Sequence, residues 1–372
     1  MKITISASST LMSGIQTVLN IVPPKTTLPI LSNMLLETED GYLTIGATDL
    51  DTSIVTKIPA QVTETGSITV PGRKLAEMVR ELPDEPVEIE VDGVKVVIRC
   101  DRGVFRLVGI GKEEYPALPD VPAEHTVTIP ASSLQRLIRK TVYAVSKDET
   151  HPSLWGAYLS IVQGAVRMVA TNGYRLAKTS LPGEVSETIT EGIIVPSKAL
   201  NNLSRLIGES DAPSRITIGD NHVVFDLENA RLCARLIEAT YPDYERYIPT
   251  DNDKIVKVNR EVFEGAVRRV SVLSDATTRQ IQYSARPGFI ELSSSSHDIG
   301  EAREEVPADY EGEAINTTYD FRFLLDVVER IESEDVVFKL DSPASAGIIT
   351  PSEEKVEGED YLCLIMPFRV TG

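Results

Sequence analysis

The stretch Val70-Pro71-Gly72-Arg73-Lys74-Leu75 returns 125 residues later as Val195-Pro196-Ser197-Lys198-Ala199-Leu200. Two shorter pairs recur at intervals of 126 and 123 residues: Tyr115-Pro116 with Tyr241-Pro242, and Ala47-Thr48-Asp49 with Ala170-Thr171-Asn172. Matched spacings of this kind are the signature of an internal repeat. The chain of 372 residues is long enough for two or three domains.

A third, fainter copy is marked by an amphipathic helix, and the three copies of this helix are expected over about 10–21, 131–144 and 259–272. Apolar positions at i, i+3, i+4 and i+7 occur three times, with Thr141 as a polar exception: Leu11, Gly14, Ile15, Val18; Leu134, Leu137, Ile138, Thr141; and Phe263, Ala266, Val267, Val270. A second helix is expected in each copy, over about 72–82, 197–208 and 320–331. We therefore predict three domains, 1–121, 124–250 and 254–372, joined at Pro119-Asp120-Val121-Pro122 and Pro249-Thr250-Asp251-Asn252.

Between the helices the chain alternates apolar and polar residues, as strands do. Examples are Val87-Glu88-Ile89-Glu90-Val91 and Lys95-Val96-Val97-Ile98-Arg99, with Asp92-Gly93 as the hairpin turn between them. Alternation indicates sheets with one solvated face, which are antiparallel. The predicted fold class is α+β, with two helices packed on antiparallel sheet in each repeat.

The search for catalytic chemistry is negative. Gly109-Ile110-Gly111-Lys112 is followed by Glu113, not by the Ser or Thr of a phosphate loop. The four histidines are isolated, and the three cysteines are too far apart for a metal-binding motif. An odd cysteine count and no long apolar run favour a cytoplasmic protein. We expect no enzymatic activity, no metal and no cofactor.

Positive charge is concentrated on the predicted helices, although the net charge of the chain is −19. The six helical windows sum to +6, so the remainder carries −25. Such segregation is typical of a surface for a polyanion, contacted through phosphates without base reading. An alternative explanation of this charge is that the helices have ordinary solvated faces. Two other classes of protein also remain as alternatives: a repeat scaffold that binds only proteins, and an enzyme with an unrecognised site. The cations on these helices that we expect to face DNA are Arg73, Arg136, Arg139, Lys140, Lys198, Arg205, Arg268 and Arg269.

Several motifs resemble the bacterial sliding clamp family, the beta subunit of the replicative DNA polymerase III. The similarity runs from end to end. The motifs are Thr27-Leu28-Pro29-Ile30-Leu31, Thr48-Asp49-Leu50, Val70-Pro71-Gly72-Arg73-Lys74, Val169-Ala170-Thr171-Asn172-Gly173-Tyr174-Arg175-Leu176, Tyr241-Pro242-Asp243-Tyr244 and Met366-Pro367-Phe368-Arg369-Val370.

The resemblance implies a head-to-tail homodimer that closes into a ring around duplex DNA, with helices lining the hole. It implies a processivity factor that tethers DNA polymerase III, the clamp loader and repair proteins through short hydrophobic peptide motifs. It carries DNA contacts over to Lys25 and Lys198, whereas Pro152 and Ser153 replace aromatic contacts of the family. Dimer contacts carry over to Lys74, Phe105 and Leu107 on one side, and to Val272 and Leu273 on the other.

The same resemblance places a peptide-binding cleft between the second and third domains. Tyr174 stands where the family often has His, the family has Met-like residues near Phe368, and Thr371-Gly372 extend past the usual ending. The cleft residues are Leu154, Thr171, Gly173, Tyr174, Arg175, Leu176, Pro242, Arg246, Leu364, Met366, Pro367, Phe368 and Arg369. Arg175 and Arg246 are expected to meet polar groups of the peptide.

Overall fold

The computed structural model describes the chain except for residues 118, 120–124, 149, 163, 186–188 and 369–372. The described chain forms two compact units. The first comprises Met1–Leu134 and Lys198–Leu236, and the second comprises Gln135–Ser197 and Ile237–Gly372. The strands of the middle repeat are divided between the units because each unit has a sheet that continues from one repeat into the next. The following residues named above lie outside the described part: Asp120, Val121, Pro122, Arg369, Val370, Thr371 and Gly372.

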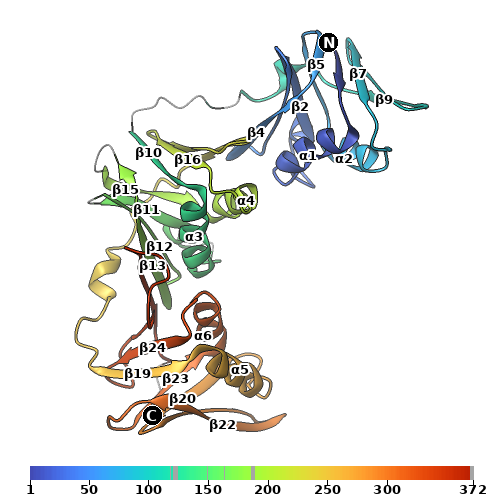
Figure 1. Cartoon of the computed structure of the whole chain (residues 1–372). Coiled ribbons are helices and arrows are strands. Elements are labelled where there is room, and N and C mark those ends of the chain that lie inside the picture. Colours follow the sequence, from blue (N-terminus) through green and yellow to red (C-terminus); the bar gives the residue numbers. More distant parts are fainter. Residues whose placement is uncertain (118, 120–124, 149, 163, 186–188, 369–372) are drawn as a thin grey trace. The chain divides into compact units, whose positions relative to one another are not determined.

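Two helices cover the sheet at the start of the first unit, α1 (Ser8–Leu19) and α2 (Gly72–Arg80), which pack side by side (Figure 1). Leu11, Ile15 and Val18 are fully buried on α1, which confirms the predicted apolar stripe. Gly14 lets α1 approach the sheet closely, because a Cβ there would lie 2.8 Å from a side-chain carbon of Ile58. The helix runs over 8–19 rather than the expected 10–21.

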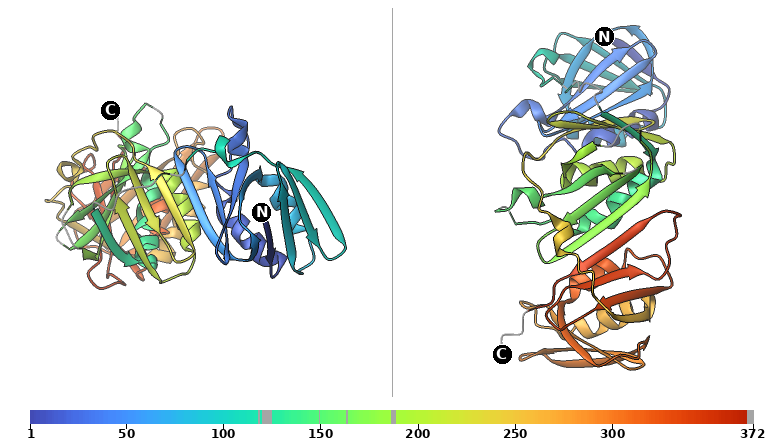
Figure 2. Two further views of the ribbon diagram at one scale, coloured as in Figure 1. Left: turned by 90° about the horizontal axis from the view of Figure 1, so that it is seen from above. Right: turned by 90° about the vertical axis from the view of Figure 1, so that its left-hand side faces the viewer.

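One sheet of the first unit has a strand order that places the N-terminal strand β1 inside the sheet, between β5 and β7. The order is β5 (Gln61–Glu64), β1 (Lys2–Ile5), β7 (Val87–Asp92), β8 (Lys95–Cys100), β9 (Gly103–Val108). Figure 2 shows β9 as the outer strand. The predicted hairpin is confirmed: Asp92 pairs with Lys95, and Gly93 takes the positive φ of 58° that the turn requires.

The other sheet of the first unit continues across two repeats. Its antiparallel order within the unit is β10 (His125–Pro130), β16 (Pro213–Ile218), β17 (His222–Asp226), β18 (Ala230–Arg235), β4 (Thr52–Pro59), β3 (Tyr42–Thr48), β2 (Asn33–Glu39), β6 (Ser67–Pro71). The crossing point is the pairing of β18 with β4, where Ser53 lies opposite Cys233. Helix α4 (Ser197–Ile207) buries Leu200 and Leu203.

The second unit has the same construction on a longer sheet. Its order is β15 (Ile189–Pro196), β11 (Gly156–Val162), β12 (Ala165–Thr171), β13 (Arg175–Pro182), β26 (Asp360–Ile365), β25 (Gly347–Pro351), β24 (Asp335–Leu340), β19 (Lys254–Asn259), β22 (Gly300–Asp309), β21 (Phe289–Ser296), β20 (Gln280–Arg286), β23 (Ile315–Asp320). The crossing point between repeats is the pairing of β13 with β26, where Leu176 lies opposite Leu364.

Helices α5 (Arg260–Ser271) and α6 (Phe321–Val328) lie together in the second unit (Figure 1). The α5 stripe is buried as predicted, and the rings of Phe263 and Phe338 pack edge to face with centroids 5.1 Å apart. Asn259 and Asp320 cap the two helices through side-chain acceptors.

The expected helix over 131–144 is shorter in the structure. Helix α3 (Ala131–Thr141) ends where the Thr141 hydroxyl donates to the carbonyl oxygen of Leu137 at 2.7 Å, and a 3-10 turn follows. The remaining short elements are β14 (Glu184–Val185) and the 3-10 helices η1 (Pro29–Ser32), η2 (Lys112–Glu114), η3 (Val142–Ala144), η4 (Pro152–Leu154) and η5 (Tyr244–Tyr247). No described helix is long and apolar enough to cross a membrane.

Candidate peptide and DNA interfaces

The loop between β12 and β13 is fixed by two side chains that bond back to the main chain. The Thr171 hydroxyl donates to the carbonyl oxygen of Arg175 at 2.7 Å, and Asn172 Oδ1 accepts from the amides of Tyr174 and Arg175, each at 3.0 Å. Gly173 has a φ of 86°, and a Cβ there would find no atom within 4 Å. The loop is therefore rigid, with open space above its glycine.

An apolar floor lies next to this loop. Leu176 and Leu364 are 5% and 4% exposed and belong to one buried cluster with Val169, Tyr244 and Ala346. Three tyrosines, Tyr158, Tyr241 and Tyr244, form an aromatic wall at its edge. The rings of Tyr158 and Tyr241 stack with centroids 5.0 Å apart, and both pack against the buried cluster. Sequence reasoning missed Val169, Ala346 and these tyrosines, although the Tyr-Pro repeat already singled out Tyr241.

Exposed apolar side chains lie beside the floor. Tyr174, Met366 and Phe368 are 67%, 40% and 36% exposed. The Met366 amide donates to the carbonyl oxygen of Tyr174 at 2.8 Å, so the end of β26 is attached to the loop. Leu154, Pro242 and Pro367 are half-buried, whereas Arg369 lies outside the described residues.

The structure corrects the role expected for Arg175. Its guanidinium bonds to the Asp326 carboxylate and to the carbonyl oxygen of Tyr143, and it lies 4.6 Å from the ring centroid of Phe323. The residue is only 8% exposed, so its guanidinium is not available to a peptide. Arg246 remains at the surface, with its side chain 82% exposed and paired with Asp243 at 2.6 Å.

The cations of α3 are also corrected. Lys140 is 2% exposed, so the expectation that it faces DNA is wrong. Its ammonium pairs at 2.9 Å with the fully buried Glu359, which also accepts a bidentate pair from Arg136 at 2.8 and 2.7 Å. Glu332 pairs with Arg136 and Arg139. The helix charge was counted without these two carboxylates, which arrive from distant loops.

Burial and pairing oppose each other in this ionic cluster. Burial alone raises the pKa of Glu359, but the hydrogen bonds from Arg136 and Lys140 hold it below its usual value. Burial likewise lowers the pKa of Lys140 against the pull of Glu359. Glu359 is therefore the counter-ion that keeps two cations charged within the second unit.

The other expected DNA-facing cations differ in their partners. Arg268 pairs with Glu264 at 2.9 Å and Glu329 at 2.5 Å, and Arg269 pairs with Glu304 at 2.5 Å. Lys198 pairs with Asp49 in the first unit. In the part of the chain that the structure describes, Lys25, Arg73 and Arg205 have no carboxylate partner; Arg73 donates to the carbonyl oxygen of Val22 at 2.9 Å.

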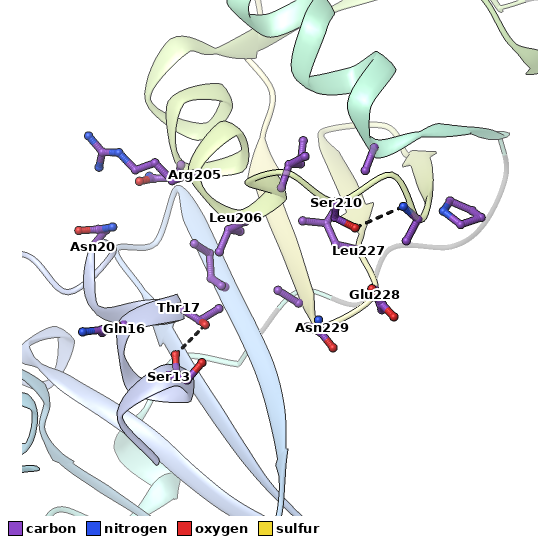
Figure 3. Close-up of a pocket in the computed structure, with 17 residues that line it drawn as sticks. Ser13, Gln16, Thr17, Asn20, Arg205, Leu206, Ser210, Leu227, Glu228 and Asn229 are labelled. Atoms are coloured by element: carbon purple, nitrogen blue, oxygen red, sulfur yellow. Dashed lines mark hydrogen bonds between the residues drawn. The ribbon is translucent and has the colours of Figure 1, made fainter. Parts of the chain in front are cut away.

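Arg205 lies at a pocket of about 380 Å³ between α1 and α4 of the first unit (Figure 3). Gln16 and Asn20 of α1 line the same pocket. The side chains of Gln16 and Asn20 offer amide donors, and Glu228 adds one carboxylate to the same lining. Among the described residues Arg205 forms no ion pair, so its charge is available to an external anion.

The residues expected at the dimer seam are surface residues. Phe105 and Leu107 are two positions apart on the edge strand β9, so they lie on the same face of it. Phe105 is 36% exposed. Lys74 is an exposed residue of α2, and Val272, directly after α5, is 73% exposed beside the half-buried Leu273. An open, apolar edge strand is a site that native proteins normally cover.

No metal centre is formed by the described His, Cys, Asp and Glu residues. The three cysteines are buried and free, and burial raises the pKa of Cys233 and of Cys363 to about 11. Such thiols are not activated nucleophiles. What the geometry offers is binding surface.

Comparison with known proteins agrees with this assessment. Family models of the DNA polymerase III beta subunit match residues 1–119 (N-terminal domain), 128–243 (central domain) and 245–369 (C-terminal domain). The beta sliding clamp of Caulobacter vibrioides is 33% identical over all of both chains, and that of Bacillus subtilis is 32% identical over 99% of this chain and 100% of its own.

Solved structures give the same result. The DNA polymerase III subunit beta of Pseudomonas aeruginosa is 30% identical, with a TM-score of 0.95 over 100% of both chains. Another structure of the Pseudomonas aeruginosa clamp contains griselimycin, with a TM-score of 0.95 and the same coverage. The dimeric ring expected above is consistent with these matches. The chain therefore belongs to the DNA polymerase III beta subunit family, the sliding clamps of bacterial DNA replication, which are processivity factors and not enzymes.

Proposed function

We propose that this clamp recruits its partners through one surface of the second unit, called here the peptide surface. It is the apolar floor of Leu176 and Leu364 with the residues around it: Leu154, Thr171, Gly173, Tyr174, Pro242, Arg246, Met366, Pro367 and Phe368. Arg369, which lies outside the described residues, is included on the family resemblance alone. Arg175 holds this surface in place through its bonds to Asp326 and Tyr143. The occupants are short peptide segments, ending in Leu or Phe, of DNA polymerase III, the clamp loader and repair proteins.

The observation that carries this proposal is the pairing of a buried apolar floor with exposed apolar side chains. Met366 and Phe368 expose 40% and 36% of their surface beside it. When a few apolar side chains are transferred from water into an apolar surface of this kind, they supply most of the binding free energy of a small interface. Ordering of the peptide opposes binding, so an affinity of about 1 μM, or roughly −8 kcal/mol, is expected.

Fluorescence polarisation with a labelled peptide ending in Leu-Phe tests the peptide surface. Met366→Ala combined with Pro367→Ala should weaken binding at least about tenfold, because each truncation removes apolar contact. Ile299→Ala is the matched control, since Ile299 is an exposed apolar residue at 60% on another hairpin. Equal binding by the double variant and the parent would show that the peptide surface is elsewhere.

DNA contact is proposed to be electrostatic and independent of sequence, through Lys25, Arg73 and Arg205, with Lys198 as a fourth, shared cation. These residues have the charge to meet phosphates, and no base-reading group accompanies them. A clamp loaded on a nicked circle should stay bound and should leave when the circle is cut. Tight retention on a short linear duplex at physiological salt would contradict topological binding.

Ring closure is proposed to use Lys74, Phe105 and Leu107 of one protomer against Val272 and Leu273 of its partner. A head-to-tail contact is heterologous and closes because three repeats per chain make six around the circle. Leu273→Asp should bury an unpaired charge at the seam, so sedimentation should show monomers. An unchanged dimer would remove Leu273 from the seam.

The domain limits 1–121, 124–250 and 254–372 and a cytoplasmic location belong to the same proposal. Residues 121 and 124 lie outside the described part of the chain. The cytoplasm is supported by three free, buried cysteines, which suit a reducing compartment.

A further inference from the structure

The loop that supports the peptide surface is built a second time in the first unit. The Thr48 hydroxyl donates to the carbonyl oxygen of Thr52 at 3.2 Å, as Thr171 does to that of Arg175. Asp49 Oδ1 accepts from the Thr52 amide at 2.7 Å and from the Asp51 amide at 3.2 Å, which are the bonds that Asn172 makes in the other loop. The two loops have the same main-chain hydrogen bonding.

The strands that follow the two loops also correspond. Ser53 on β4 lies opposite Cys233 on β18, as Leu176 lies opposite Leu364. The Arg235 amide donates to the carbonyl oxygen of Asp51 at 2.8 Å, which matches the 2.8 Å bond from Met366 to Tyr174. We call this shared arrangement the docking frame, with one copy in each unit.

Four of the side chains that differ between the two copies of the docking frame bear directly on an apolar plug, and in addition Asp51 and Thr52 stand where the second unit has Tyr174 and Arg175. The floor pair is Leu176 and Leu364 in the second unit, but Ser53 and Cys233 in the first. Met366 at the strand end is replaced by Arg235. Gly173, with a φ of 86° and open space around it, is replaced by Leu50, which takes a φ of 81° and is half exposed.

Each replacement works against an apolar plug. The Ser53 hydroxyl donates to Thr48 Oγ1 at 2.9 Å, so one of the two floor residues is polar and already bonded, while Cys233 is smaller than the leucine it replaces. A plug over Arg235 would have to desolvate a charge. Leu50 projects a side chain where Gly173 leaves the main chain open to close approach. A left-handed leucine is rare, which makes this replacement notable.

The first copy has room for a larger floor. A cavity of about 580 Å³ is lined by Ser53, Val55 and Cys233 together with Tyr42 and Arg231. Small side chains at the floor positions leave this space open, and leucines there would fill part of it. The main chain of the first copy thus has the conformation that peptide binding requires, and only its side chains prevent a hydrophobic peptide from binding.

We infer that the docking frame occurs twice in each chain and that Gly173, Leu176, Leu364 and Met366 restrict hydrophobic peptides to the copy in the second unit. This inference rests on the proposed function of the peptide surface. Leu50, Ser53, Cys233 and Arg235 silence the first copy. The main chain provides the frame, and these side chains set its specificity.

Transplanting the four side chains tests the inference. The background is Met366→Ala with Pro367→Ala, in which the second copy is impaired. Adding Leu50→Gly, Ser53→Leu, Cys233→Leu and Arg235→Met should restore binding of the labelled Leu-Phe peptide at least about tenfold. Val55→Leu in the same background is the control, because it adds apolar volume to the cavity wall outside the four positions.

A folded transplant that binds no better than its background overturns the inference. If circular dichroism shows that the transplant is unfolded, Gly173→Leu in the otherwise unchanged protein decides instead. Leu50 shows that this frame accepts leucine at the glycine position, so the variant should fold and lose peptide binding at least about tenfold. Unchanged binding by Gly173→Leu overturns the inference. Failure of the proposed function is distinguishable, because the parent protein would then bind no peptide.

Discussion

The cations of the two units differ in what they are paired with. In the first unit, Lys25, Arg73 and Arg205 have no carboxylate partner among the described residues, whereas in the second unit Arg136 and Lys140 share a buried Glu359. Arg268 and Arg269 likewise have partners at the surface. Basic residues therefore have two uses: some hold the fold together, and others remain available to an external polyanion.

The largest effect should come from Glu359→Gln, which leaves Arg136 and Lys140 without their buried counter-ion. Breaking a buried pair from one side costs about 3–5 kcal/mol. Urea unfolding should therefore show a much lower midpoint for the second unit. Glu329→Gln is the control, because Glu329 is 38% exposed in its pair with Arg268 and should cost less than about 1 kcal/mol. Equal losses would contradict the distinction between structural and exposed cations.

Arg175→Gln should have the next largest effect. It removes charged hydrogen bonds to Asp326 and to Tyr143, and bonds of this class contribute about 1.5–3 kcal/mol. Thermal unfolding should show the loss. Arg246→Gln, at a residue whose side chain is 82% exposed, should leave the unfolding temperature unchanged. If the Arg175→Gln protein is as stable as the parent but binds peptide more weakly, Arg175 contacts the peptide directly.

The pH dependence of stability should identify Glu354, near the ionic cluster of the second unit. Burial, aided by the charge of Glu359, raises the pKa of Glu354 to about 6. The folded state then favours the protonated form, so this contribution to stability is full below about pH 4.5 and is lost as pH rises through 6. Glu354→Gln should gain stability relative to the parent between pH 5 and about 7, by less than about 1 kcal/mol because solvent screens the charge. A difference in unfolding free energy between Glu354→Gln and the parent that stays constant from pH 5 to about 7 would show that Glu354 does not have a raised pKa.

A smaller effect is expected from Asp49→Asn, which releases Lys198 in the first unit. Asn172 shows that asparagine can make the loop bonds of Asp49, so the loop should survive. DNA binding should become more dependent on salt, with the slope of log K against log salt rising by up to about 0.9. An unchanged slope would show that Lys198 does not reach DNA.

The repeat allowed much of the fold to be predicted from the sequence. The spacing of Val70-Pro71 and Val195-Pro196 led to the three copies, and the apolar stripe of Phe263, Ala266, Val267 and Val270 identified the faint third one. Alternation correctly gave antiparallel sheets. The end of α3 was misplaced because the local hydroxyl bond of Thr141 leaves no mark in hydrophobic periodicity.

The charge of the site was harder to predict, because it depends on contacts between residues far apart in the chain. Arg136 and Glu359 are separated by 223 positions, and no local pattern connects them. Lys140 was placed on an open face because its helix has no acidic residue of its own. The duplicated loop could have been recognised, since Thr48-Asp49 already aligned with Thr171-Asn172. The positive φ at Leu50 could not have been predicted from the sequence, because leucine rarely adopts that conformation.

The central claim is that the free cations of the first unit, and not the paired cations of the second, meet DNA. A salt titration of duplex binding with two triple variants tests it most directly. Alanine at Lys25, Arg73 and Arg205 should reduce the slope of log K against log salt by up to about 0.9 per residue. Alanine at the half-exposed Arg139, Arg268 and Arg269 should leave the slope nearly unchanged. Equal reductions in the two variants, or a larger one in the second, would contradict the account.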